Sequence, residues 1–476
     1  MSVNSWHEAG AARMAQAVKN REVTAGKLVR ECVARIEATD ARINAFTDLT
    51  TPRALARAAE IDAMLAGRVS EAAALNAAEM PLLGVPFAVK NLFDVRGLTT
   101  RAGSKIECSR PPATADAELV RRLEVAGAIL VGALNMDEYA YGFTTENSHY
   151  GPVHNPHDLT RIAGGSSGGS GAALAAGQVP LTLGSDTNGS IRVPASLCGV
   201  FGLKPTYGRL PRTGSYPFVA SLDTLGPLAR NVADLALAYD AMLGPDADDP
   251  ACAQRPPAPT TALLGRGSEG LRIGVLAGYF SVNAGEQARE AVATVARALG
   301  AVRFLELPEV ERARAAAFVI GNSEGGALHL ADLRTRAADF EPLSRDRFIA
   351  GTLLPAAWVY QAQRVRLWFA RQVAQIFTEV DVLLAPATPN AATPIGSETM
   401  DVNGRAVPTR PNTGMLTQPI SCIGLPVCAV PVWPQEGATM PVGVQIIAAP
   451  WREDLVLRVA AALEAAGVVS APVAAL

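Results

Sequence analysis

The sequence predicts an α/β fold in which helices cover both faces of a β-sheet. Of its 476 residues, 49% are hydrophobic but only 5% are aromatic. The core must therefore be built from Ala, Val, Leu and Ile, which suits helices packed on a sheet. Apolar runs typical of strands also alternate along the chain with segments of helical periodicity. This length is sufficient for one large domain or two ordinary ones.

Residues 1–75 are rich in Ala and carry charges of alternating sign, as in AARMAQAVKN and AGKLVRECVARIEA. The spacing of their apolar positions is helical. We expect an N-terminal helical layer over 1–75 and a single α/β core over 76–476. The polar face of the layer is a solvated surface in the simplest interpretation, and a docking face for a partner helix in the alternative one.

The core begins with a succession that is typical of an α/β unit. A strand is predicted over 82–90, a helix over 115–127 and a second strand over 128–134. Residues 163–190 then indicate a loop, a short buried helix, a strand and a tight turn, and helix resumes near Ile191.

Residues 244–268 contain many Pro and polar residues, so we expect a surface connection there. The alternation of strands and helices resumes beyond it. The predicted elements are, in order, a strand over 271–276, a helix over 286–299, a strand over 302–307, long helices to about 378, strands over 380–386, 425–432 and 442–448, and a helix over 452–466.

Charge and cysteine content exclude several classes of function. The formal net charge is -3 and no dense Lys/Arg block occurs, which argues against a nucleic-acid partner. The chain has no run of about twenty uncharged apolar residues and no signal-peptide pattern, so we expect a cytoplasmic protein with no membrane association. The six cysteines form no CxxC pair and have no His at zinc-ligand spacing, so we expect buried free thiols and no metal site.

Lysine is scarce, and this directs attention to Lys90. The 42 basic residues include only five lysines: Lys19, Lys27, Lys90, Lys105 and Lys204. Lys90 ends the apolar strand GVPFAV. Arg keeps its proton in proteins, whereas burial can lower the pKa of Lys by roughly 3 to 5 units from about 10.4. Lys90 is therefore a candidate base, and the alternative is a buried stem whose ammonium group reaches water.

The segment GGSSGGSG at 164–171 admits three simple interpretations, and each one fails. A phosphate loop would need a Lys-Ser/Thr pair that is missing. A nucleophile elbow centred on Ser167 would need a later acid and then a late His, and the only later His is His329, followed by helices and strands. A flexible linker would not continue directly into the apolar run AALAAGQVPLTL.

A wider pattern resolves the choice. Residues 164–206 closely resemble the amidase signature, GVPFAVKNLFDVRGLTTRAGS resembles the lysine segment of that family, and NMDEYAYGFTTENSHYG and GLPVCAVP fit it as well. The resemblance implies a large mixed sheet and a serine amidohydrolase that needs no cofactor. It also implies a triad in which Ser190 is the nucleophile, Ser166, in an unusual cis peptide, relays the proton, and Lys90 is the base. A serine hydroxyl needs such a base to attack a carbonyl.

The turn that ends at Ser190 comes directly before a helix, so its backbone N–H groups can surround one point. Such donors stabilise a tetrahedral oxyanion by about 3 to 4 kcal/mol each. We assign this oxyanion hole to the backbone of Thr187, Asn188, Gly189 and Ser190. Many members of the amidase-signature family, which this chain resembles, have Gly at the place of Asn188. The side-chain amide of Asn188 is also a candidate substrate contact. Asp186 and Arg192 are expected to form a structural ion pair that braces the turn.

Within the family, the chain resembles the biuret-type amidohydrolases of bacterial cyanuric acid breakdown, for example in INAFTD, SYPFV, FEPLSRDRF and QIIAAPW. This resemblance implies that ammonia is released from a small ureido or carboxylated substrate, 1-carboxybiuret or a biuret-like compound. It also implies a homodimer, with or without a small helical partner subunit.

Two further residues are candidate substrate contacts. Arg347, in RFIAGT, resembles a position that grips a substrate carboxylate in the family. Its alternative is a surface ion pair with Asp346 or Glu341. Tyr141 lies in the segment that lines the acyl pocket of relatives, and core packing is the equal alternative.

Other functions stay open at this point. Glutaminase-type amidotransferase subunits of the same family carry an acidic residue at the place of Gly414, which counts against glutamine as the substrate. A general aliphatic or aryl amidase is a second alternative. An inactive scaffold or binding subunit is an alternative of another class, although all three catalytic positions are intact.

Overall fold

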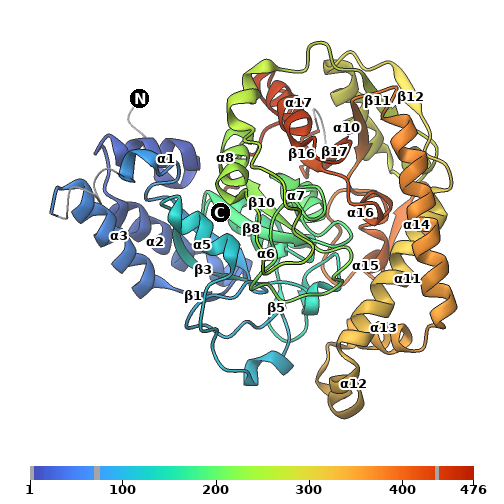
Figure 1. Ribbon diagram of the computed structural model, residues 1–476, viewed down its shortest axis with the longest axis horizontal. Helices are drawn as coiled ribbons and strands as arrows, with labels where there is room; N and C mark the ends of the chain where they lie inside the picture. Colours follow the sequence, from blue (N-terminus) through green and yellow to red (C-terminus); the bar gives the residue numbers. More distant parts are fainter. Residues whose placement is uncertain (1–4, 69–75, 435–438) are drawn as a thin grey trace.

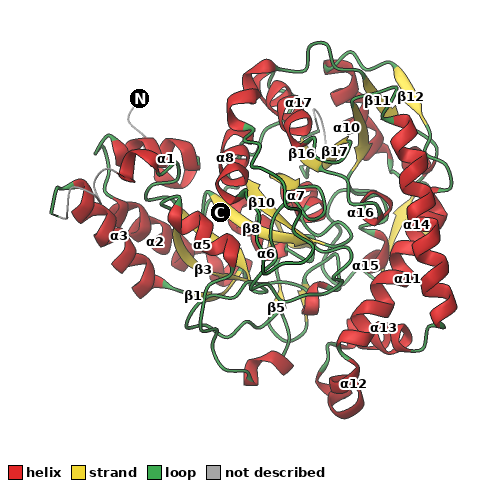
Figure 2. Cartoon of the chain, viewed as in Figure 1, coloured by secondary structure: helices red, strands yellow, loops and turns green. Residues whose placement is uncertain are grey.

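A mixed β-sheet flanked by helices forms the centre of the molecule (Figures 1 and 2). The computed structural model describes residues 5–68, 76–434 and 439–476. In this part of the chain the sheet has 11 strands. Their order is β1 (Phe46–Leu49), β3 (Ile129–Leu134), β2 (Pro86–Lys90), β8 (Leu181–Asp186), β10 (Thr224–Ala229), β9 (Phe201–Lys204), β16 (Val427–Val432), β17 (Val442–Ala448), β13 (Val382–Pro386), β11 (Ile273–Leu276) and β12 (Arg303–Leu305). The predicted fold class is confirmed.

The register of strands β2, β3 and β8 determines where the functional groups lie. β2 runs parallel to both β3 and β8, and every residue of the three strands is buried. Continuous apolar runs of this kind are typical of strands covered on both faces. Because parallel strands end at the same edge of a sheet, Lys90 at the end of β2 lies beside the end of β8, where the chain turns toward Ser190.

Helices pack against the sheet along its whole width, for example α6 on β8, α8 on β10, and α17 on β16 and β17. The α-helices are α1 (Ala11–Lys19), α2 (Ala25–Ile43), α3 (Thr51–Leu65), α5 (Glu118–Val125), α6 (Gly168–Ala175), α7 (Arg192–Cys198), α8 (Val232–Met242), α9 (Tyr279–Val282), α10 (Glu286–Ala298), α11 (Val310–Leu328), α12 (Leu330–Arg336), α13 (Pro342–Thr352), α14 (Ala356–Ile376), α15 (Thr409–Asn412), α16 (Gln418–Cys422) and α17 (Glu453–Ala465).

Short elements decorate the loops around the sheet. Three two-stranded sheets join β4 (Glu146–Asn147) to β5 (Gly151–Pro152), β6 (His154–Asn155) to β7 (Asp158–Ile162), and β14 (Thr399–Val402) to β15 (Arg405–Pro408). The 3-10 helices are η1 (Trp6–Glu8), η2 (Asn76–Glu79), η3 (Ile106–Ser109), η4 (Glu138–Ala140), η5 (Thr261–Arg266) and η6 (Ala337–Asp339). Apart from η5, residues 244–268 are mostly irregular and exposed or half-buried.

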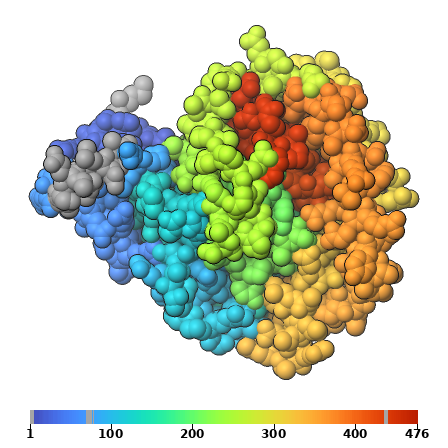
Figure 3. Space-filling model, viewed as in Figure 1, coloured from blue at the N-terminus to red at the C-terminus, as the bar shows by residue number. Residues whose placement is uncertain are grey.

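Helices α1, α2 and α3 form a lobe at one end of the molecule, at the left of Figure 3. One strand interrupts them, because β1 pairs antiparallel with β3 and so becomes the edge of the central sheet. Apolar residues of α2 reach the core at Leu28, Val29 and Ile36. The division of the chain near residue 75 stays a prediction, since residues 69–75 lie outside the described part, as do residues 1–4.

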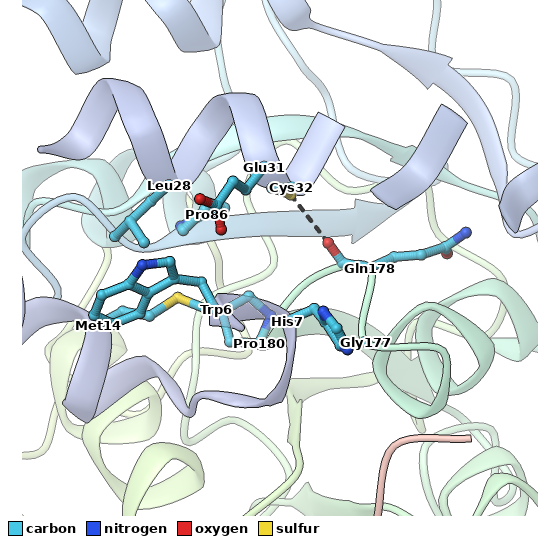
Figure 4. Close-up of a pocket in the computed structure, with 10 residues that line it drawn as sticks. All are labelled: Trp6, His7, Met14, Leu28, Glu31, Cys32, Pro86, Gly177, Gln178 and Pro180. Atoms are coloured by element: carbon cyan, nitrogen blue, oxygen red, sulfur yellow. Dashed lines mark hydrogen bonds between the residues drawn. The ribbon is translucent and has the colours of Figure 1, made fainter. Parts of the chain in front are cut away.

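Helix α2 packs over the connection between α6 and β8 (Figure 4). The Cys32 thiol donates to the Gln178 carbonyl oxygen at 3.0 Å. A cavity of about 40 Å³ remains between Trp6, Met14, α2 and Pro86 at the start of β2, which is room for about one or two waters. Burial raises the pKa of Cys32 to about 12, so this thiol is a packing group and not a nucleophile.

One buried guanidinium group ties the N-terminal segment to the same connection. Arg230, only 7% exposed, donates to the carbonyl oxygens of Leu174 and Val179 at 3.3 and 2.8 Å. It also donates to those of His7 and Ala9 at 3.1 and 2.8 Å. Burial lowers its pKa to about 10, so it keeps its charge near neutral pH.

We expect Arg230→Met to lower the free energy of unfolding by about 3 kcal/mol or more, because each buried carbonyl left without a donor costs roughly 1 to 3 kcal/mol. Urea denaturation measures this change. Arg297→Met, an exposed position on α10, is the matched control and should change the same quantity by less than about 0.5 kcal/mol. Equal stability of the two variants would contradict this account of Arg230.

Candidate active site

Lys90 ends β2 with its side chain completely buried. Its Nζ donates to Ser166 Oγ at 2.6 Å and to Ser185 Oγ at 2.9 Å. Burial lowers the pKa of Lys90 to about 7, because the ammonium form loses its hydration. Near neutral pH, a large share of this side chain is therefore an uncharged amine whose lone pair can accept a proton.

Three buried carboxylates limit how far this pKa falls. Asp137, Asp223 and Asp186 each favour the charged form of Lys90 and act in that order of strength. Without them, burial alone would lower the pKa further. The pKa of Lys90 therefore reflects a balance: lost hydration lowers it, and the charge of the carboxylates raises it.

Lys204 shows that a lowered pKa alone does not identify a base. It is also buried, and burial together with the charge of Arg192 lowers its pKa to about 7. Its Nζ, however, donates to the Pro205 carbonyl oxygen at 2.9 Å, and no serine lies within hydrogen-bond distance of it in the described part of the chain. The contact with Ser166 is what distinguishes Lys90.

Ser166 lies in the connection between β7 and α6, and the Gly165–Ser166 peptide bond is cis, as the resemblance implied. The Asp137 backbone N–H donates to the Ser166 carbonyl oxygen at 3.3 Å. A Cβ at Gly165 would lie 2.1 Å from Asp137 Oδ2, and a Cβ at Gly142 would lie 2.3 Å from Oδ1. Glycine at both positions therefore allows this carboxylate to pack directly against the backbone that carries Ser166.

Asp137 belongs to a buried network of charged side chains that the sequence analysis missed. Arg410 Nη2 lies 3.1 Å from Asp137 Oδ1 and 2.9 Å from Glu341 Oε2. Glu341 also accepts from the Ser148 backbone N–H at 3.0 Å, and burial raises its pKa to about 7. These groups come from distant parts of the chain, so no spacing in the sequence links them.

Ser190, 2% exposed, closes the turn between β8 and α7. Gly189 has φ of 137°, and a Cβ there would lie 2.0 Å from Thr417 Oγ1, so only glycine fits. The Thr417 hydroxyl donates to the Asn188 carbonyl oxygen at 2.7 Å. The end of the turn is thus held in place by a residue that sequence reasoning did not single out.

The turn also presents free backbone donors. The N–H groups of residues 187–190 donate no hydrogen bond within the part of the chain that the structure describes. By contrast, the N–H groups of Ile191 and Arg192 donate to Asp186 Oδ2 at 3.2 and 3.4 Å. A run of unpaired N–H groups at this place is what an oxyanion hole requires.

The predicted Asp186–Arg192 pair is confirmed. Both side chains are completely buried, and Arg192 Nη2 lies 2.9 Å from Asp186 Oδ1. Arg192 Nη1 also donates to Gln445 Oε1 at 2.7 Å. The pair therefore braces the turn from the side of the sheet.

Ser190 lines a cavity together with both candidate substrate contacts, Tyr141 and Arg347. Thr187 and Asn188, which the sequence analysis assigned to the oxyanion hole, line it as well. Its volume is about 20 Å³, which is room for about one water. A substrate of several heavy atoms therefore requires some of these side chains to move.

Arg347 stacks on Tyr141, with the guanidinium carbon 3.7 Å from the ring centroid. The alternative ion pairs of Arg347 are not formed, because Asp346 pairs with Arg345 and Glu341 pairs with Arg410. Tyr141 combines its two predicted interpretations: it lines the cavity and also packs against aromatic rings, and its hydroxyl donates to Asn322 Oδ1.

The structure brings Lys90 and Ser166 into direct contact, and it adds Ser185 as a second hydroxyl that the sequence analysis did not single out. Gly165, next to Ser166, and Gly142, which lines the cavity of Ser190, both pack against Asp137. The proton transfer between Ser190 and Ser166 stays a prediction.

The glutaminase alternative meets a steric obstacle. A Cβ at Gly414 would lie 2.4 Å from the ring of Phe143, which itself lines the cavity. An acidic side chain at this place would require Phe143 to move.

The six cysteines are free, as predicted. Cys108 is exposed, so the expectation of burial is wrong at this position: η3 buries Ile106 and Glu107 and leaves Cys108 and Ser109 in solvent. Among the described residues, no group of His, Cys, Asp or Glu side chains could hold a metal ion.

No helix in those residues combines the length and the apolar character needed to cross a bilayer.

Comparison with known proteins places these residues in a family. Residues 27–457 match the amidase family model. The AtzE chain of 1-carboxybiuret hydrolase from Pseudomonas sp. (strain ADP) is 58% identical over 95% of this chain and 97% of its own. A glutamyl-tRNA(Gln) amidotransferase subunit from Chloroflexus aurantiacus (strain ATCC 29366 / DSM 635 / J-10-fl) is 41% identical over 92% of both chains.

Solved structures agree with this result. One belongs to a vestigial protein complex that reveals the evolutionary origins of an s-triazine catabolic enzyme. It superposes with a TM-score of 0.94 at 56% identity, over 97% of this chain and 99% of that chain. A second, an amidase, gives a TM-score of 0.85 at 32% identity, over 96% and 100% of the two chains.

We expect a fluorophosphonate reagent to label Ser190 with a rate that rises with pH through a midpoint near 7, because only the uncharged amine of Lys90, whose pKa is about 7, accepts the proton. Mass spectrometry of the labelled peptide measures the rate. A rate that is flat between pH 6 and pH 8 would contradict the role of Lys90.

Asp137→Asn should move this midpoint to lower pH, since loss of the carboxylate that most favours charged Lys90 lowers the lysine pKa. The same labelling measurement tests the shift. A lower rate at every pH with an unchanged midpoint would instead indicate that Asp137 has only a packing role.

Proposed function

The chain belongs to the amidase family of amidohydrolases, and we propose that it hydrolyses a C–N amide bond of a small ureido or carboxylated substrate, 1-carboxybiuret or a biuret-like compound. The reaction proceeds through an acyl-enzyme on Ser190. The observation that carries this proposal is the buried Lys90 amine, with a pKa of about 7, in hydrogen-bond contact with Ser166.

The three side chains act in sequence during acylation. Ser190 Oγ attacks the carbonyl carbon while its proton passes to Ser166 Oγ, and the Ser166 proton passes to Lys90 Nζ. The resulting ammonium group is stabilised by the nearby carboxylates of Asp137, Asp223 and Asp186. A serine hydroxyl becomes an effective nucleophile only when its proton is removed in this way.

Charge that develops on the carbonyl oxygen is met by the N–H groups of residues 187–190, the assigned oxyanion hole. Their lack of other partners in the described part of the chain supports this role, because donors that are already in place need no reorganisation during the reaction. One such donor contributes about 3 to 4 kcal/mol in well-studied hydrolases.

Collapse of the tetrahedral intermediate breaks the C–N bond. The proton held by Lys90 returns through Ser166 to the leaving nitrogen, so that ammonia departs and the acyl group stays on Ser190. Water then attacks the ester, and the same relay takes and returns its proton. No atom outside the substrate, water and the three side chains is needed for this balance.

Two observations support a carboxylated ureido substrate. A relative that is 58% identical is part of a 1-carboxybiuret hydrolase. The cavity beside Ser190 also contains Arg347, which forms no ion pair with any carboxylate in the described part of the chain. A guanidinium group without a carboxylate partner matches the two oxygens of a substrate carboxylate.

The alternatives have less support. Glutamine hydrolysis, as in the amidotransferase relative that is 41% identical, is disfavoured by the contact between Gly414 and Phe143. A general aliphatic or aryl amidase would leave the charge of Arg347 without a use in the cavity. An inactive scaffold would not need a lysine with a pKa of about 7 beside Ser166.

We also propose a homodimer in the cytoplasm, with a small helical partner subunit. The related structure of a protein complex supports an assembly. So do large apolar side chains exposed on and near α14, at the right edge of Figure 1: Leu353, Trp358, Tyr360, Leu367 and Trp368. Large exposed apolar side chains gathered along one helix are typical of a protein–protein interface.

We expect the purified protein to release ammonia faster from 1-carboxybiuret than from biuret, allophanate, glutamine or acetamide. Ser190→Ala and Lys90→Met should each lower kcat by at least about 10³-fold, as for other members of catalytic triads. Lys105→Met removes a lysine at the surface and is the matched control with unchanged turnover. Preference for glutamine would refute the proposed substrate, and no hydrolysis at all would favour the scaffold.

Arg347→Met should raise KM for 1-carboxybiuret by about 10- to 100-fold, the range expected when a charged hydrogen bond is lost. Biuret lacks the carboxylate, so its KM should change much less. Steady-state kinetics with both substrates measure the difference. An equal effect on the two substrates would mean that Arg347 supports the cavity wall and does not bind the carboxylate.

A further inference from the structure

Three carboxamide side chains line the cavity beside Ser190, and the oxygen of one of them is unused. Asn322 Oδ1 accepts from the Tyr141 hydroxyl, and Gln418 Oε1 accepts from Arg314 Nε at 2.7 Å. Asn188 Oδ1 is buried and accepts no hydrogen bond from any described residue. A buried acceptor without a donor is costly, so its place in the cavity beside Ser190 requires an explanation.

The backbone around Asn188 is held firmly, so the point from which its side chain enters the cavity is fixed. Its carbonyl oxygen accepts from the Thr417 hydroxyl at 2.7 Å. The preceding Thr187 donates its hydroxyl to Asp223 Oδ1 at 2.5 Å. On the facing helix α11, residue 321 is glycine, and even a Cβ there would lie 3.6 Å from Asn188 Nδ2.

We propose that Asn188 is a specificity-determining residue whose Oδ1 accepts a hydrogen bond from the N–H that joins two carbonyl groups in a ureido substrate. This inference rests on the proposed function and deepens it. Asn188 and Ser190 line the same small cavity, so a substrate whose carbonyl meets Ser190 lies within reach of the Asn188 amide. Amides with a carbon atom at that place leave the oxygen unpaired and bind more weakly.

The side chain at position 188 decides whether a neighbouring N–H can be recognised there. A glycine at this place would have no side chain to recognise a neighbouring N–H. The charged group that we assign to the substrate carboxylate, Arg347, lies on α13, so the two residues would recognise different parts of one molecule.

Biuret and malonamide form a matched pair for the test, because malonamide has CH₂ where biuret has the central N–H. We expect biuret to bind the Ser190→Ala variant more tightly than malonamide, as measured by isothermal titration calorimetry. In the double variant with Asn188→Ala, the ratio of the two dissociation constants should fall by about tenfold. Asn188 has no positive φ, so Ala suits its backbone.

Ser190→Ala with Asn322→Ala is the control, because it removes a carboxamide whose oxygen is already occupied by Tyr141. Its ratio of dissociation constants should match that of Ser190→Ala. If Asn188→Ala fails to fold, Asn188→Gly replaces it. A ratio that Asn188 substitution leaves within twofold, or no binding of either compound, would overturn the proposal.

The outcome is separable from that of the proposed function. Hydrolysis of ureido substrates by the wild-type protein tests the reaction, whereas the ratio of dissociation constants tests Asn188. Turnover of 1-carboxybiuret with an unchanged ratio would refute Asn188 alone. An absence of turnover with the expected fall in the ratio would refute the reaction and keep the binding contact.

Discussion

Removal of water from one lysine is the constraint on which the rest of the site depends. Strand β2 ends in a completely buried Lys90, and the lost hydration lowers its pKa to about 7. Buried carboxylates oppose this effect, and Asp137 is the strongest of them. The glycines at 142 and 165 let that carboxylate approach. The burial of β2, the two glycines and the charge of Asp137 therefore all act on the pKa of Lys90.

Much of the fold followed from local patterns. Continuous apolar runs predicted β2, β3 and β8, and burial on both faces of the sheet explains why those runs are unbroken. The short strand β1 was not predicted within the N-terminal helical layer. Its four residues show the burial pattern of a half-exposed edge, which is too short a signal to separate from the helical segments on either side.

The candidate site was only partly accessible to sequence reasoning. Lys90 could be singled out because lysine is rare, whereas only the resemblance to the amidase signature ranked Ser166 above the other serines of its segment. The partners Ser185, Asp137 and Arg410 could not, since their roles arise from contacts between distant segments. Thr417 is a similar case: nothing near it in the sequence indicates that it supports the turn before Ser190. Tertiary contact, not local pattern, determines these roles.

The charge state of Lys90 can be observed directly, since the chain has only five lysines. Nuclear magnetic resonance with ¹³C-labelled lysine follows each side chain as pH changes, and Lys90→Met identifies the signal in question. This account predicts that the signal titrates with a midpoint near 7, in line with the pKa of about 7. A midpoint above about 10, the ordinary range of lysine, would contradict it.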